Sequence, residues 1–373
     1  MALTIDWTEV FDVTQTIPHD FSAGIYRLDS GSLLAALANT AGFVTSMDFW
    51  RSTDNGATWS LLSNLPARQP GRGPRLLKFP GDIVCYPAWS DDNINLQIFR
   101  STNGGASWSL VDTFTGNDPT PRTTNTPQTA RTHNIHMGIF GGHFADFPSV
   151  VHSQFAVTND AGSSWTLGPA PFGAANNRIC ESLAFSPGGI GLAGGTQKQI
   201  FRTTDAGASW TSVGPLPDAG QNSNIEIFGA IFLTDDIAIV GGVGNPPTGP
   251  PTSAYLYRST DGGLNWTALA RSALSDFPST GNIPWISELK RLSRDAAILG
   301  LQTRANAGAS PIRVSLDGGL TYPLTGAGWD LTGKIAEVSG AIAVASNGKI
   351  LVPVEVTASG RNQTEIWSGQ VVC

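Results

Sequence analysis

The chain has 373 residues, of which only 14% are charged, and its formal net charge is −7. Because no basic stripe is present to neutralise phosphates, the composition argues against nucleic acid as a partner. No run of 18 consecutive apolar residues occurs, so the sequence predicts no membrane span. The 43 glycines and 24 prolines indicate many tight turns.

The first predicted element is a strand over residues 5–10. The residues before it contain neither a basic n-region nor an apolar h-region, so we expect no secretory signal in this chain. An intracellular protein, a mature form with an added Met and a virion protein that leaves its host by lysis all fit this start. Abundant Thr, Asn and Gly with few Cys and Lys resembles bacteriophage tail and surface proteins.

A short motif then returns six times, at intervals of about 50 residues. In its first copy Ser52 leads, Asp54 follows two positions later, then Gly56 and Trp59. An Asp at the head of a tight turn accepts backbone hydrogen bonds, and the Gly supplies a positive φ without a Cβ clash. We identify these motifs as Asp-boxes, each a hairpin turn between two strands. The six copies span residues 52–59, 101–108, 158–165, 203–210, 259–266 and 315–322.

Each period also contains two earlier apolar runs, such as 226–232 and 237–240, which makes four strands per repeat. Four-stranded repeats arranged radially are the blades of a β-propeller. After Tyr322 the chain offers three more strands and lacks a fourth. Trp7-Thr8 resembles Trp59-Ser60, the pair that begins the strand after a box. The N-terminal strand is therefore expected to complete the last blade. The prediction is an all-β, seven-bladed propeller, closed by the N-terminal strand, as one domain over residues 1–373.

Cysteine and histidine give little evidence for bridges or metals. Cys85, Cys180 and Cys373 are odd in number and far apart, so buried thiols are expected rather than disulfides. His133 and His136 lie three apart and point to opposite faces of a strand, so no metal site is predicted. The sequence predicts no cofactor, although a Ca²⁺ ion on oxygens such as those of Asp91 and Asp92 stays open.

Polar residues near the beginnings of the predicted inner strands form the candidate site. Acidic groups and guanidinium forks around a channel mouth recognise sugars and carboxylates respectively. Solvated lining of a wet channel explains the same residues and stays open as the alternative. The candidate ligand-binding residues on these strands are Arg27, Arg75, His136, Glu181, Glu226 and Glu337.

The boxes resemble those of the sialidase-like, or BNR, propellers, and the resemblance covers nearly the whole chain. Tyr26-Arg27-Leu28 is similar to a segment whose Arg holds the substrate carboxylate in that family. Glu288 and Arg304 resemble the family's Glu and its next Arg. The family's Tyr nucleophile has no counterpart, because the last blade contains no Tyr. If the chain hydrolyses glycosides, we expect catalytic carboxylates among Glu288, Asp29 and Asp82.

These features favour a non-catalytic recognition, attachment or structural propeller on a virion or another extracellular surface. Its expected partner is a glycan or cell-surface receptor, with other virion proteins as further partners. A sialidase-like glycoside hydrolase is the alternative. An assembly factor that docks on another protein is a third interpretation, which the acidic net charge does not favour.

Overall fold

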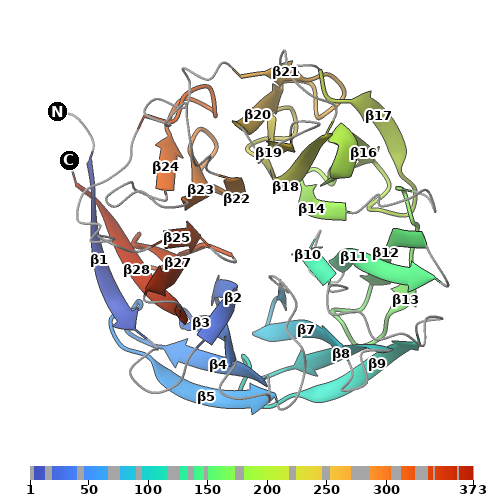
Figure 1. The fold of residues 1–373 in the computed structure, drawn as a ribbon. Coiled ribbons are helices and arrows are strands. Elements are labelled where there is room, and N and C mark those ends of the chain that lie inside the picture. The colour runs from blue at the N-terminus through green and yellow to red at the C-terminus, as the bar shows by residue number, and fades with distance from the viewer. Residues whose placement is uncertain are drawn as a thin grey trace.

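The protein is described by a computed structural model that covers residues 4–12, 19–39, 46–65, 76–89, 95–115, 127–132, 138–146, 150–172, 180–217, 224–245, 253–269, 285–303, 312–323, 335–338, 341–358 and 361–372. Within these residues the regular structure is β-strand, apart from the 3-10 turn η2 (Thr196–Lys198). The sheets stand around a central axis as the blades of a β-propeller (Figure 1). No helix among these residues is long and apolar enough to cross a membrane.

Five sheets contain four antiparallel strands each, taken consecutively from the chain. First strands such as β2, β14 and β18 lie nearest the axis (Figure 1). The strands are β2 (His19–Arg27), β3 (Leu33–Asn39), β4 (Ser46–Ser52) and β5 (Ser60–Leu65); β6 (Leu77–Phe79), β7 (Ile83–Trp89), β8 (Asn95–Ser101) and β9 (Ser109–Thr115); β10 (Pro127–Thr132), β11 (Gly138–Asp146), β12 (Val150–Thr158) and β13 (Thr166–Leu167); β14 (Cys180–Phe185), β15 (Gly191–Gly195), β16 (Gln199–Thr203) and β17 (Thr211–Pro215); and β18 (Asn224–Phe232), β19 (Ala238–Asn245), β20 (Ser253–Ser259) and β21 (Thr267–Ala268).

The remaining strands form one eight-stranded sheet, where the sequence predicted two separate blades. β24 pairs with β23 only at residues 297–300, so the end of β23 keeps free backbone groups. β25 takes these groups, opposite Gln302 and Thr303. The prediction of seven separate blades is therefore not what the structure shows. The strands are β22 (Trp285–Arg291), β23 (Ala297–Thr303), β24 (Ile312–Ser315), β25 (Ile335–Val338), β26 (Ala343–Val344), β27 (Ile350–Ala358), β28 (Arg361–Val372) and β1 (Thr4–Asp12).

The N-terminal strand closes the ring as the sequence predicted. β1 runs antiparallel to β28, with Thr4 opposite Val372 and Asp12 opposite Glu365. Trp7 and Trp367 therefore lie in one sheet, and both side chains are buried. Trp7 faces Gly369, where an added Cβ would lie 2.6 Å from the indole ring. The glycine makes room for the tryptophan.

A second contact joins the first sheet to the eight-stranded sheet. Gly24 of β2 forms a parallel bridge with Ala341, and the N–H of Ile25 donates to the carbonyl of Ala341 at 2.8 Å. Gly24 has φ +115°, and an added Cβ would lie 2.1 Å from the nitrogen of Ala341. Near the rim Ser346 Oγ lies 2.6 Å from Asn55 Oδ1. Main-chain contacts therefore reinforce side-chain packing at this seam.

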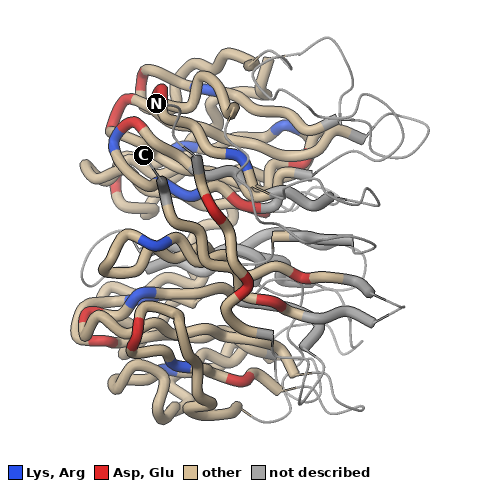
Figure 2. The backbone as a smooth tube through the Cα atoms, turned by 90° about the vertical axis from the view of Figure 1, so that its left-hand side faces the viewer, with Lys and Arg blue, Asp and Glu red and all other residues tan. Residues whose placement is uncertain are grey.

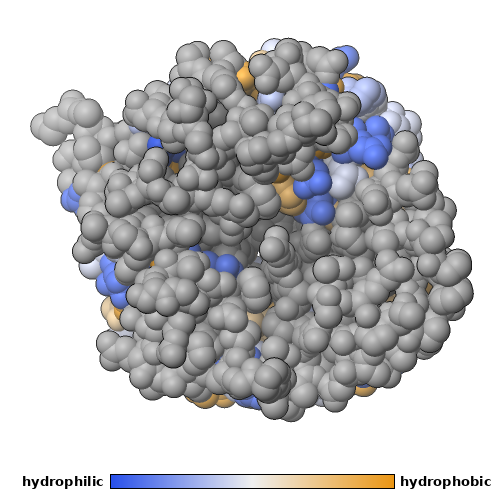
Figure 3. All heavy atoms as spheres, viewed as in Figure 1, coloured by the Kyte–Doolittle hydropathy of each residue, from blue (hydrophilic) through white to orange (hydrophobic). Residues whose placement is uncertain are grey.

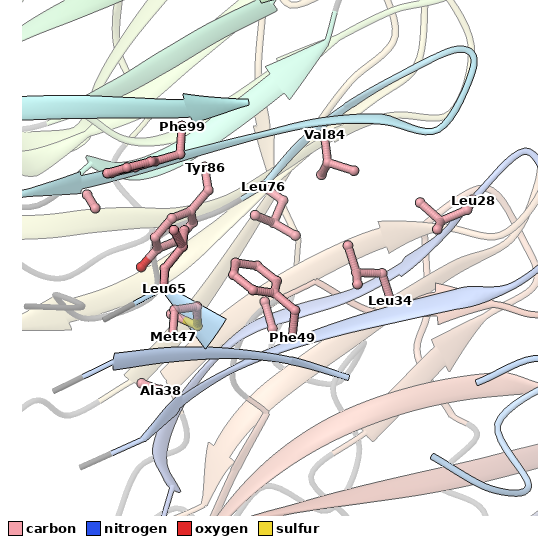
Figure 4. Close-up of a cluster of buried hydrophobic side chains, with 12 residues drawn as sticks. Leu28, Leu34, Ala38, Met47, Phe49, Leu65, Leu76, Val84, Tyr86 and Phe99 are labelled. Carbon is pink, nitrogen blue, oxygen red and sulfur yellow. The ribbon is translucent and has the colours of Figure 1, made fainter. Parts of the chain in front are cut away.

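The hydrophobic core lies between neighbouring sheets. Between the first two sheets, Leu34 and Phe49 of one pack against Val84, Tyr86 and Phe99 of the other (Figure 4). The rings of Phe49 and Tyr86 meet edge to face, with centroids 5.8 Å apart. Alternate residues of each strand supply such contacts, because successive side chains point to opposite faces.

The Asp-box turns join the third and fourth strands of sheets. In the first turn Ser52 Oγ donates to Asp54 Oδ1 at 2.8 Å and accepts from Gly56 N at 2.8 Å. Asp54 in turn accepts from Thr58 N at 2.9 Å, and its bonds to Thr58 lower the pKa of Asp54 to about 2. In the other turns a glycine N–H likewise donates to the hydroxyl oxygen of the first residue, which is Ser101, Thr158, Thr203, Ser259 or Ser315.

An arginine that directly precedes a box reaches the next sheet. Arg202 Nε donates to the carbonyl of Gly262 at 2.8 Å, in the box turn of the following sheet. Nε of Arg100 and Nε of Arg258 make the same bond to Ala161 and Gly318, and Arg51 reaches the Gly104 carbonyl through Nη2. The third box is preceded by Val157, which cannot donate such a bond. Four of the seams thus carry one repeated side-chain link.

Candidate functional site

The inner strands surround a channel along the propeller axis. Hydrophilic described residues are visible near the middle of the ring on the face shown in Figure 3. A cavity of about 670 Å³ occupies one end of the channel. Its lining comes from the last residues of inner strands and the turns that follow them, such as Arg27, Ser186 and Arg291. The strand beginnings lie towards the other end.

Glu181 and Glu226 meet near the beginnings of two neighbouring inner strands. They are the second residue of β14 and the third of β18, and both are half-buried. Burial, and then the nearby carboxylate of Glu226, raise the pKa of Glu181 to about 8. Burial also raises the pKa of Glu226. Two neighbouring carboxyl groups with raised pKa values can hold and pass a proton near neutral pH.

Local backbone irregularities aim these side chains. Cys180 faces Gly195 and Ser182 faces Gly194, so Glu181 is the extra residue of a β-bulge. Bulges bend a strand and redirect a side chain, and they are common beside functional sites. Gly242 adjoins Val243, which faces Glu226, and an added Cβ on Gly242 would lie 1.7 Å from the Glu226 carbonyl oxygen. The Gly-Gly pairs in β15 and β19 are the sequence signal for these close approaches.

Glu288 lies deeper in the channel than this pair. It is the fourth residue of β22, its exposed fraction is only 3%, and it lines the cavity. It faces Gly300 of β23, directly after another bulge that lies between Ile286 and Glu288. Its buried position towards the cavity separates it from Glu181 and Glu226, which do not line that cavity.

Arg27 does not lie at the end of its strand where the reading of the inner strands placed it. It was expected near the beginning of an inner strand, but it is the last residue of β2 and is exposed at the cavity. The strand begins at His19, eight residues earlier, and it ends at Arg27 because the turn at residues 28–32 follows directly. Arg27 therefore belongs to the end of the channel opposite Glu181 and Glu226.

Asp29 and Asp82 join the first turns of two neighbouring sheets. Asp82 Oδ1 accepts from Asp29 N at 2.5 Å, and Asp29 Oδ2 accepts from Gly81 N at 2.8 Å. Asp29 also pairs with Lys78, and that bond is the main reason why the pKa of Asp29 is lowered. These contacts give both carboxylates a structural role. Their catalytic pairing with Glu288 stays a prediction.

Four other candidate residues cannot be given side-chain surroundings. Glu337 is the third residue of β25, opposite Gln302 and Glu355 across its two neighbouring strands. Only its backbone position is described. The remaining candidates, Arg75, Arg304 and His136, lie outside the described residues, as do Asp91, Asp92 and Cys373. The other two thiols, those of Cys85 and Cys180, are buried as predicted, and neither is joined to another described cysteine.

All five tyrosines lie within the described residues. Tyr26 lines the cavity, but its hydroxyl accepts the N–H of Leu76 at 2.9 Å. Tyr86, Tyr257 and Tyr322 are fully buried, and burial raises the pKa values of Tyr86 and Tyr322. Tyr255 packs against a core cluster. None of them resembles an activated nucleophile beside a carboxylate.

No group of three metal-ligating side chains occurs among the residues for which the structure gives positions. Of the histidines, His133 and His136 lie outside those residues, and only the strand positions of His143 and His152 are known.

Comparison with known proteins agrees with this architecture. The BNR/Asp-box repeat matches residues 50–61, the end of β4 and the first box turn. A probable oligoxyloglucan-reducing end-specific xyloglucanase of Neosartorya fischeri is 30% identical over 135 residues. That match spans 34% of this chain and only 16% of the relative's length.

Solved structures with the same fold cover almost the whole chain. YCF48 bound to a D1 peptide has a TM-score of 0.55 at 14% identity, covering 99% of this chain and 97% of the other. An alpha-L-arabinanase of Penicillium chrysogenum complexed with arabinobiose has a TM-score of 0.51 at 14% identity, covering 100% and 98%. At this identity the likeness concerns the fold. The resemblance to BNR/Asp-box β-propellers is thus confirmed in repeat and fold.

Proposed function

We propose that this protein is a glycoside hydrolase whose catalytic carboxyl pair is Glu181 and Glu226. The observation that carries the proposal is the pair itself, two neighbouring inner-strand carboxyls whose pKa values are both raised. Glycosidases use two carboxyl groups beside the scissile bond, one protonated and one ionised. The partial match to a xyloglucanase and the fold of an arabinanase support the same reaction class.

The two residues take different roles. With a pKa of about 8, Glu181 keeps its proton at neutral pH and donates it to the leaving-group oxygen. Glu226 acts in its ionised form on the other side of the bond. Protonation of one carboxyl group changes the proton affinity of the other, so the pair titrates as a unit. A sialidase route through a tyrosine nucleophile has no support from the five tyrosines.

We further propose how the architecture divides. The eight-stranded sheet corresponds to a sixth blade, β22 to β24, and a seventh, β25 to β28 with β1, joined through β23 and β25. The six hydrogen-bonded turns correspond to six Asp-boxes, and the whole chain to one domain. Support comes from the recurrence of the turns at intervals of 45 to 57 residues and from the closure of β1 on β28.

A second candidate is glycan recognition without turnover, on a virion or extracellular surface. It is favoured by the lack of a tyrosine nucleophile and by the peptide and sugar complexes of the two similar structures. In this case Glu181 and Glu226 accept hydrogen bonds from sugar hydroxyls. The protein would then bind the glycan without releasing a product.

The test combines a glycan array with product analysis on xyloglucan oligosaccharides, arabinan oligosaccharides and sialosides. We expect Glu181→Gln and Glu226→Gln to lower the turnover number by about 10² to 10⁴-fold. Asp236→Asn is the matched control, because this exposed carboxylate lies in the turn at the far end of the β18–β19 hairpin. Binding without product in the unchanged chain supports recognition, and the absence of both contradicts a glycan function.

The pH dependence follows from the same pair. The folded chain holds the Glu181 proton up to about pH 8, whereas the unfolded chain loses it near the ordinary value of 4.5. Activity should therefore fall as pH rises through about 8, and stability should fall over the interval from 4.5 to 8. Glu181→Gln should flatten the melting temperature across this interval. An unchanged slope in that variant would contradict the raised pKa.

A further inference from the structure

We propose a second binding site, for a small anionic ligand, in the cavity at the end of the channel opposite Glu181 and Glu226. Four cationic side chains line this cavity, and they come from three inner strands on different sides of the axis. They are Arg27 at the end of β2, Lys78 in β6, and Lys290 and Arg291 at the end of β22. The ligand class is a carboxylate or a phosphate. The proposal is independent of any hydrolytic activity.

Arg27 is the cation most available to a ligand. It is exposed at the cavity, and among the described residues its guanidinium has no hydrogen-bond or ion-pair partner. A guanidinium presents a planar fork of donors that matches the two oxygens of a carboxylate or phosphate. Arg291 is also exposed, and its Nε donates to the Ser293 carbonyl at 3.3 Å. That bond uses Nε and does not occupy the terminal nitrogens of Arg291.

The nearby carboxylates are largely held by other contacts. Asp29 pairs with Lys78 and accepts from Gly81 N, which fixes Lys78 at the rim. Asp235 accepts from Gly188 N at 2.6 Å, and Arg291 contributes a small part of its lowered pKa. Glu288 is buried inside the cavity wall. Of the residues that line the cavity, four are cationic and one, Glu288, is acidic, in a chain whose overall charge is −7.

The shape of the cavity suits a compact organic anion. Its volume of about 670 Å³ lies within the range of small-molecule sites, roughly 300 to 1,000 Å³. Apolar residues such as Phe232 and Leu289 contribute to its walls between the charges. The side view in Figure 2 shows basic and acidic positions interspersed along the described backbone.

Isothermal titration calorimetry of the whole chain with citrate, inorganic phosphate and glucose 6-phosphate tests the site, with glucose as the uncharged probe. We expect at least one anion to bind and glucose not to bind. Citrate alone indicates a carboxylate site, and phosphate or glucose 6-phosphate a phosphate site. Binding should weaken as salt rises, because exposed charges are screened beyond about 10 Å at 0.1 M.

Two variants locate the binding. Arg27→Gln and Arg291→Gln should each weaken the bound anion about tenfold, since each removes a charge-assisted hydrogen bond. Arg294→Gln is the control, because Arg294 is exposed in the turn after β22 and does not line the cavity. Melting curves confirm that the variants fold. If no anion binds, or if all three variants weaken binding equally, the proposal is wrong. Glu181→Gln should leave anion binding unchanged, which separates this site from the proposed catalytic pair.

Discussion

The closing seam of the ring and the ordinary seams between consecutive sheets are held in different ways. Between consecutive sheets the contact consists of packed side chains and hydrogen bonds that each involve a side chain, such as Arg202 to the Gly262 carbonyl and Gly188 N to Asp235. At the closing seam the main chain itself takes part, through β1 on β28 and Gly24 on Ala341. Consecutive sheets are tethered by the chain, whereas the first and last regions must find each other without a tether. Main-chain pairing supplies the specific register that they need.

Removal of β1 should have the largest effect on this comparison. Deletion of residues 1–12 removes the buried side chains of Ile5 and Trp7 and leaves β28 as an open edge. We expect unfolding to lose its cooperativity, as measured by circular dichroism. A circular permutant that begins at Val13 and carries residues 1–12 behind Cys373 should fold, because Thr4 lies opposite Val372. A deletion variant that melts like the whole chain would contradict the importance of the closing seam.

Gly24→Val should have the next largest effect. The new side chain would meet the Ala341 backbone and would need a φ of +115°, so we expect a loss of more than about 3 kcal/mol in the free energy of unfolding. Gly31→Val is the matched control, with φ +85° and nothing within 4 Å of an added Cβ. Urea denaturation of both variants separates the cost of backbone strain from the cost of losing the close contact between Gly24 and the Ala341 backbone. Equal losses would show that the bridge to Ala341 contributes nothing.

Arg202→Ala tests an ordinary seam. Loss of one charged donor should reduce the free energy of unfolding by about 1 to 2 kcal/mol, and Arg100→Ala should behave alike. The expected loss is smaller than for Gly24→Val because side-chain packing still joins the sheets. Arg294→Ala, in an exposed turn, should change the urea midpoint little. A loss as large as that of Gly24→Val would remove the distinction between the seams.

Ser346→Ala should have the smallest effect. Its hydroxyl contacts Asn55 on the exposed rim of the closing seam. Exposed polar contacts usually change stability by less than about 0.5 kcal/mol. Thermal melting should therefore show almost no shift, and a clear shift would mean that the rim, rather than the strands, holds the ring closed.

Much of the fold could be predicted from the sequence because its signals are local. The Asp-box depends on one hydroxyl, one carboxylate and one glycine within five residues, and Trp7-Thr8 repeats the pattern that follows a box. The joining of β23 to β25 was missed because it depends on how far β24 extends, and strand length is poorly encoded locally. Arg27 was placed at the wrong end of its strand because nothing in the sequence fixes where β2 begins.

The carboxyl pair shows the limit for the site. Glu181 and Glu226 were singled out individually, but their proximity could not be predicted, since they lie in different repeats at slightly different strand positions. The bulge at Glu181 decides where its side chain points. The pairs Gly194-Gly195 and Gly241-Gly242 could have indicated such bulges, since glycine in a strand often marks a close backbone approach.

The pairing of Thr4 with Val372 also fixes where anything joined to this protein must attach. The described ends of β1 and β28 lie side by side on the outer circumference, at the blue and red limits of Figure 1. A fused label, surface anchor or neighbouring module would therefore attach at the outer edge of the propeller. The cavity lies among the inner strands, away from this edge, so immobilised protein should bind small ligands as well as free protein does.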